Sequence, residues 1–180
     1  MSKMRRKTTE TDIVVGLQPG TGIAAIDTTE PFLDHMLVTL ARYARLDLDV
    51  EATGDLTHHL VEDVALTLGA ALLDEIPDAC ARYGDAAVPM DDALVQVVID
   101  GGGRPFYEGP LPDRHYDHFF RSLAGACGMT LHVLVLRGDD RHHVVEAAFK
   151  AFGLALRQAL RTTDAVFSTK GSVQLERLED

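Results

Sequence analysis

The sequence predicts an α+β fold of two similar halves that arose by internal duplication. Each half is expected to be a small β-sheet with two helices on one face, and the halves to pack around a shared helical core. Two observations carry this prediction. The segment His-His-x-Val-Glu occurs twice, at residues 58–62 and 142–146. In both places it follows a helical pattern, an alternating strand pattern and a Gly-Asp turn in the same order.

The individual elements follow from local patterns. Apolar and β-branched segments bounded by glycine or proline predict strands at Thr11–Leu17, Gly22–Asp27, Leu46–Val50, Ala93–Asp100, Arg104–Tyr107 and Leu131–Val135. Helical patterns open at Asp34-His35 and Asp117-His118, and again at each His-His-x-Val-Glu. We therefore expect one domain of two repeats, about residues 8–90 and 91–174, with a disordered tail at 175–180.

Size and composition narrow the class of protein. A chain of 180 residues can bury a sizeable core as one domain. Its formal charge of −11 argues against nucleic acid or an anionic membrane as partner. No apolar run is long enough to span a membrane, and the first residues lack the apolar core of a signal peptide. Cys80 and Cys127 fit small core residues better than a redox pair, so we expect a reducing, cytoplasmic compartment.

The doubled motif points to metal binding. Side chains four apart share a helix face, so His58 and Glu62 can aim at one point, and the second copy repeats the arrangement. The adjacent histidine, His59, points about 100° around the helix and serves a different site more easily. Imidazole and carboxylate ligands together suit a divalent first-row transition metal. Paired surface histidines at a helix start are the alternative interpretation. Two copies in register favour metal binding over this alternative much more strongly than one copy would.

Four histidines lie outside the two motifs. His35 and His132 sit in apolar surroundings, where a lone histidine is usually a core residue, but two metal motifs make both candidate ligands. His115 and His118 are interpreted as ordinary surface residues. Structural zinc usually requires cysteines, which are too few here. The collected donors fit two octahedral sites with open positions, which implies Lewis-acid chemistry on a substrate.

Several longer segments resemble the imidazoleglycerol-phosphate dehydratase family, and the resemblance covers nearly the whole chain. It includes Arg6-Lys7-Thr8-Thr9-Glu10-Thr11, Phe32-Leu33-Asp34-His35-Met36-Leu37, both His-His-x-x-Glu segments with the flanking residues Asp63 and Ala147, Gly103-Arg104-Pro105, Phe119-Phe120-Arg121-Ser122-Leu123 and Ser168-Thr169-Lys170-Gly171. The order of these motifs is the family's order.

The resemblance implies a ribosomal protein S5 domain 2-like fold and a hydro-lyase of histidine biosynthesis. Such an enzyme dehydrates D-erythro-imidazoleglycerol phosphate to imidazoleacetol phosphate. It implies two Mn²⁺ per active site, with other divalent transition metals possible, and sites at subunit interfaces of a 24-subunit cage assembled from trimers. Metal on a ring nitrogen would stabilise an imidazolate that expels hydroxide from the neighbouring carbon. Loss of the adjacent C–H proton then gives an enol and finally the ketone.

Roles carried over from the resemblance fall into three sets. The metal ligands would be His35, His58, His59, Glu62, His132, His142, His143 and Glu146. The substrate phosphate would be held by Arg82, Arg104, Ser168 and Lys170, with Thr39 where the family has a glutamine. Glu10 is the first choice for proton transfer and Asp91 the second.

The chain departs from the family pattern beside the first motif. The loop before His58 is short, and Leu60 replaces a common threonine. A divergent dimetal paralogue acting on another phosphorylated or imidazole-containing substrate is therefore the main alternative. A metal-stabilised shell without turnover is a further alternative, but it would leave the phosphate residues unexplained.

Overall fold

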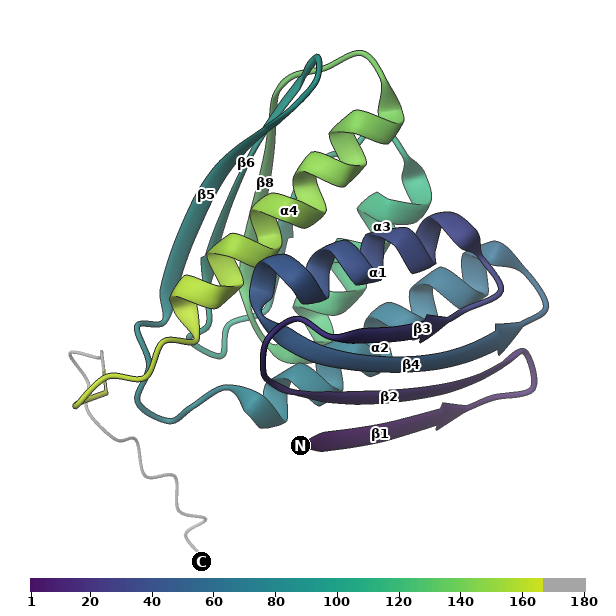
Figure 1. Cartoon of the computed structure of the whole chain (residues 1–180), viewed down its shortest axis with the longest axis horizontal. Helices are drawn as coiled ribbons and strands as arrows, with labels where there is room; N and C mark the ends of the chain where they lie inside the picture. The colour runs from purple at the N-terminus through teal and green to yellow at the C-terminus, as the bar shows by residue number, and fades with distance from the viewer. Residues whose placement is uncertain (167–180) are drawn as a thin grey trace, which may run out of the picture.

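The computed structural model describes residues 1–166 and consists of two halves with the same element order (Figure 1). The first half contains β1 (Ser2–Lys7), β2 (Thr11–Pro19), β3 (Ala24–Asp27), α1 (Pro31–Ala44), β4 (Leu46–Gly54) and α2 (Thr57–Glu75). The second contains β5 (Tyr83–Met90), β6 (Ala93–Asp100), β7 (Phe106–Glu108), α3 (Arg114–Cys127), β8 (Thr130–Arg137) and α4 (Arg141–Ala159). The predicted tail at 175–180 lies outside the described residues.

Each half forms a four-stranded sheet, and the two sheets have the same topology. The strand orders are β1-β2-β4-β3 and β5-β6-β8-β7. In each sheet the first three strands of this order pair antiparallel and the last joins in parallel. The predicted α+β fold of two similar halves is confirmed.

Sequence patterns missed the first strand of each sheet, β1 and β5. Both are edge strands, which need no continuous apolar face because one side has no partner strand. β1 reads Ser-Lys-Met-Arg-Arg-Lys and is mostly exposed. β5 contains Gly84 and Pro89, and proline is tolerated in strands chiefly at sheet edges.

The helices lie between the two sheets and form the shared core (Figure 1). Four phenylalanines, Phe119, Phe120, Phe149 and Phe152, are among its largest fully buried side chains. The rings of Phe120 and Phe149 have centroids 4.8 Å apart. Cys80 and Cys127 are buried and form no disulfide, as predicted, and burial raises the pKa of Cys127 to about 12. Among residues 1–166 no helix is long and apolar enough to cross a membrane.

Helices of different halves pack in pairs, α1 with α4 and α2 with α3. Glycines at matching repeat positions allow the close approach. A Cβ on Gly69 of α2 would lie 2.7 Å from the Cβ of Ala126 on α3, and one on Gly153 of α4 would lie 2.8 Å from the Cβ of Tyr43 on α1. The pairing therefore places each His-His-x-Val-Glu helix against a helix of the other half.

Candidate metal centre

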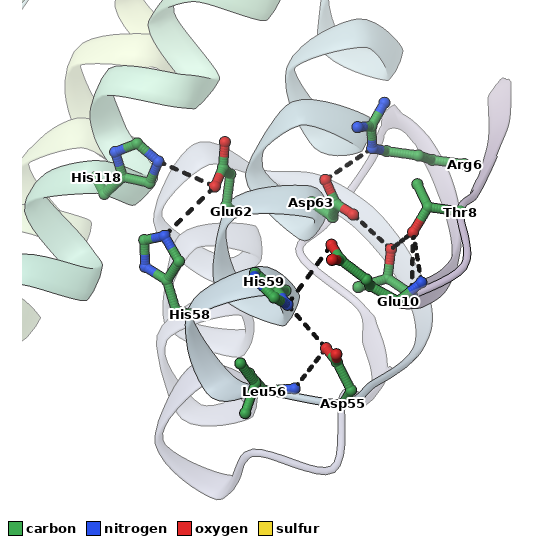
Figure 2. A network of polar contacts seen from close by, with 11 residues as sticks. Arg6, Thr8, Glu10, Asp55, Leu56, His58, His59, Glu62, Asp63 and His118 are labelled. Carbon is green, nitrogen blue, oxygen red and sulfur yellow. Dashed lines mark hydrogen bonds and ion pairs between the residues drawn. The ribbon is translucent and has the colours of Figure 1, made fainter.

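The first motif forms a three-residue group with a histidine from the opposite half. His58 and Glu62 lie on one face of α2, and His118 reaches the same carboxylate from α3 (Figure 2). The Nε2 atoms of His58 and His118 are 3.6 Å and 3.2 Å from Oε2 of Glu62. The two imidazole rings stack with centroids 5.3 Å apart. All three ligand atoms lie within 4.8 Å of one another, so one metal ion could contact all of them.

The second motif forms the equivalent group on the other helix pair. His142 and Glu146 lie on α4, and His35 joins them from α1. The Nε2 atoms of His35 and His142 are 3.4 Å and 3.1 Å from Oε2 of Glu146. The duplication has therefore repeated the donor set as well as the fold, with two imidazole nitrogens and one carboxylate in each group.

A lysine distinguishes the second group from the first. Nζ of Lys150 lies 2.9 Å from Oε1 of Glu146, one helical turn along α4, and 3.1 Å from the sulfur of Met90. Burial of the Glu146 carboxylate opposes its ionisation. The ion pair with Lys150 and the contact with His35 outweigh that effect, so the pKa of Glu146 lies below its ordinary value. Leu66 occupies the corresponding position of α2.

The second histidine of each motif faces away from these groups, as the turn of a helix predicts. Nδ1 of His59 lies 2.8 Å from Oδ1 of Asp55, and Nδ1 of His143 lies 2.6 Å from Oδ1 of Asp92. Each of these hydrogen bonds raises the pKa of its histidine. A carboxylate on one ring nitrogen is the usual partner of a histidine whose other nitrogen binds metal. Both rings are thus held in an orientation suited to ligation through Nε2.

Glu10 and Asp91 occupy matching hairpin turns beside these outward histidines. Glu10 lies between β1 and β2, and its Oε2 is 3.6 Å from Nδ1 of His59. Asp91 lies between β5 and β6, and its Oδ2 is 3.4 Å from Nε2 of His143. Both side chains are more than half exposed, so they are accessible for proton transfer.

Of the remaining histidines, His118 is placed differently from the sequence interpretation, and His132 joins no group within the described part of the chain. His118 was interpreted as a surface residue, but it completes the first group. The repeat contained the signal, because Asp117-His118 opens its helix as Asp34-His35 does. His132 lies on β8 with its ring 5.5 Å from that of Phe106, and it belongs to neither of these two groups. It also lies outside a third cluster of possible metal ligands in residues 1–166, which is formed by Glu10, Asp55 and His59.

The arginines predicted to bind phosphate converge on one carboxylate at the end of β6. Asp100 accepts hydrogen bonds from Nε and Nη2 of Arg82 at 2.6 Å and 2.9 Å, and from Nη2 of Arg104 at 3.2 Å. Arg82 also lines a pocket with Gly101, Gly102 and Val166. Ser168 and Lys170 lie outside the described residues, and Thr39 is buried on α1.

Comparisons with known proteins agree on one family. The model of the family described as imidazoleglycerol-phosphate dehydratase matches residues 28–156. Proteins of that name from Methanoculleus marisnigri and Methanococcoides burtonii are 45% and 46% identical, over 96% and 94% of this chain and 98% and 97% of theirs. A crystal structure of IGPD from Pyrococcus furiosus superimposes with a TM-score of 0.85 at 41% identity, covering 94% of this chain and all of the other. A crystal structure of imidazoleglycerol-phosphate dehydratase from Staphylococcus aureus superimposes with a TM-score of 0.79 at 32% identity. That match covers 91% of this chain and all of the other.

Proposed function

Because the chain belongs to the imidazoleglycerol-phosphate dehydratase family, we propose that its two three-residue groups hold the metal ions used in the dehydration that this family performs. The chain is a lyase of histidine biosynthesis that removes water from imidazoleglycerol phosphate. The observation that carries the metal proposal is the repetition of one donor set at equivalent places in both halves.

The donor chemistry fits a divalent first-row metal. Each group offers two imidazole nitrogens and one carboxylate oxygen, a set that suits manganese and its neighbours. We assign Mn²⁺, two ions per active site, with other divalent transition metals as substitutes. We add His118 to the proposed ligands because it lies beside His58 and Glu62. His132 is proposed as a ligand only because of the resemblance to the family.

A neighbouring copy of the chain is proposed to complete each group. Three ligands leave coordination positions open, and His59 and His143 face away from the two groups formed around Glu62 and Glu146. The carboxylates on their Nδ1 atoms orient Nε2 for a site outside the chain. We therefore place the active sites between subunits of a homo-oligomer, with trimers assembling into the cage that the family resemblance implies.

The residues divide the reaction between binding and proton transfer. A bound metal would supply Lewis-acid stabilisation of negative charge on the substrate's imidazole ring. Arg82 and Arg104, held in place by Asp100, are proposed to bind the phosphate together with Ser168 and Lys170. Glu10, with Asp91 as second choice, is proposed to take the proton from the carbon next to the one that loses hydroxide.

Two experiments test this proposal. Purified protein is incubated with imidazoleglycerol phosphate, with and without a chelator, and the enolisable ketone product is followed. We expect turnover that the chelator abolishes and Mn²⁺ restores, and unchanged turnover in chelated, metal-free protein would contradict the metal proposal. Mixing two inactive variants, His59→Ala and Glu62→Ala, should restore part of the activity if sites lie between subunits.

The buried, unpaired cysteines support a reducing compartment, and we propose the cytoplasm.

A further inference from the structure

A buried carboxylate next to a proposed metal ligand has no part in the reaction as described so far. Asp63 follows Glu62 on α2 but points to the opposite side, toward β1 and β2 (Figure 2). It is 8% exposed. Nε of Arg6 donates a hydrogen bond to its Oδ1 at 2.8 Å, and the hydroxyl of Thr11 donates to its Oδ2. Asp63 thus links α2 to both strands of the β1–β2 hairpin.

The hydrogen bonds continue from Asp63 into the hairpin turn in a defined direction. The Thr11 proton is directed to Asp63, so the Thr8 hydroxyl, 3.1 Å away, must donate to the oxygen of Thr11. Oγ1 of Thr8 in turn accepts from the backbone N–H groups of Glu10 and Thr11, each at 3.0 Å. A carboxylate that only accepts therefore orients the whole chain of donors, which ends at the amide of Glu10.

The other side of Glu10 is also fixed. Its carbonyl oxygen accepts from the backbone N–H of Asp55 at 3.1 Å, in the turn that precedes α2. Hydrogen bonds therefore hold the backbone on both sides of the Glu10 side chain. Oε2 of Glu10 lies 3.6 Å from Nδ1 of His59 (Figure 2). The position of the Glu10 carboxylate thus depends on the contact between Asp63 and the hairpin.

In the second half, different hydrogen bonds hold the corresponding turn between β5 and β6. Ala147 occupies the position that corresponds to Asp63. Asp92 of the turn itself accepts from the backbone N–H groups of Asp139 and Asp140 at 2.7 Å and 3.2 Å. The repeated fold therefore does not require an aspartate at this position, because the corresponding residue of α4 is an alanine. Its network belongs to the turn that carries Glu10.

We propose that Asp63 is a positioning residue for Glu10, acting through Thr11 and Thr8. The inference rests on the proposed role of Glu10 in proton transfer. A proton-transfer group displaced by about 1 Å can lose about a hundredfold in rate while substrate binding is little affected. The network predicts that loss of the Thr11 hydroxyl or of the Asp63 charge lowers kcat and leaves KM nearly unchanged.

The test uses variants of the whole 180-residue chain, in whatever assembly it forms in solution. Thr11→Val keeps the shape of the side chain but removes the donor, and Asp63→Asn keeps the shape but removes the charge. Thr11→Ser keeps the hydroxyl. Arg5→Gln is the matched control, because Arg5 pairs with Asp12 at 3.0 Å and 2.7 Å on the exposed face of the same hairpin. kcat, KM, bound Mn²⁺ and amide exchange of residues 8–11 are measured for each variant.

We expect Thr11→Val and Asp63→Asn to lower kcat by about tenfold to a hundredfold, with KM changed less than about threefold and bound Mn²⁺ unchanged. Exchange in residues 8–11 should quicken in both, whereas Thr11→Ser and Arg5→Gln should behave as wild type. If Asp63→Asn does not fold, Thr11→Val decides alone. Wild-type kcat in Thr11→Val, beside an inactive Glu10→Gln, would overturn the positioning role and leave Glu10 intact. An active Glu10→Gln would instead overturn the proposed role of Glu10, and the positioning role with it.

Discussion

Nε2 of His118 lies 3.2 Å from Oε2 of Glu62, although the two residues stand on helices from different halves of the chain. The contact depends on the packing of α2 against α3, and the packing of α1 against α4 repeats it for His35 and Glu146. Each proposed metal group therefore exists only when the two halves are folded together. Metal binding and the association of the halves should stabilise each other.

Replacing His118 should remove a ligand from one group only. We expect His118→Gln to weaken Mn²⁺ binding at that group by at least about tenfold and to leave the other group filled. Metal analysis after dialysis at limiting Mn²⁺ would measure this loss. His115→Gln is the control, because His115 lies on the same helix outside every group in the described chain. Full metal content in His118→Gln would remove His118 from the ligand set.

Lys150 should matter most to stability when metal is absent. Lys150→Met leaves the buried Glu146 carboxylate without its lysine, a change expected to cost about 1–3 kcal/mol of unfolding free energy. A bound divalent ion would offset part of that cost by pairing with the same carboxylate. Urea unfolding of wild type and variant, with chelator and with saturating Mn²⁺, measures both values. An identical loss under the two conditions would argue against metal at Glu146.

The helix crossing at Gly69 predicts a penalty for any added side chain. Gly69→Ala would place a Cβ 2.7 Å from Ala126 and 2.8 Å from the carbonyl oxygen of Leu123, so α2 and α3 must separate. We expect a loss of about 1–3 kcal/mol and weaker metal binding by the His58 group. Gly125→Ala on α3 is the matched control, because its Cβ would meet nothing within 4 Å. That control should be neutral or more stable by up to about 1 kcal/mol. Thermal unfolding of both variants decides between these outcomes.

Much of this fold could be predicted because the sequence repeats itself. The matching order of helix, strand, turn and motif indicated the two halves, and the four-residue spacing indicated which side chains share a face. β1 was missed because an exposed edge strand has no apolar alternation to reveal it. His118 was missed because helix pairing across the halves is a tertiary fact that local patterns do not contain. The convergence of Arg82 and Arg104 on Asp100 likewise depends on three segments meeting in space.

The Asp100 contacts predict a specific loss of stability in acid. The hydrogen bond from Arg82 is the largest effect on Asp100 and, with the further contribution of Arg104, outweighs burial, so the pKa of Asp100 lies below its usual 3.8. A carboxylate with a depressed pKa in the folded state stabilises it above the unfolded pKa, and this contribution is lost as pH falls through the folded value. Asp100→Asn should therefore be less stable than wild type at pH 7 by about 1–3 kcal/mol. The gap should close below about pH 3.8. Urea midpoints across this pH range would show the convergence, and a gap independent of pH would refute it.

We propose above all that the paired His-His-x-Val-Glu groups hold the metal on which dehydration depends. This proposal is tested most directly by titrating metal-free protein with Mn²⁺ while measuring both bound ions and turnover of imidazoleglycerol phosphate. We expect no turnover without metal, and activity that rises with bound Mn²⁺ until it levels off at two ions per chain. Sites that fill completely while no ketone forms, or full turnover before any ion is bound, would contradict it.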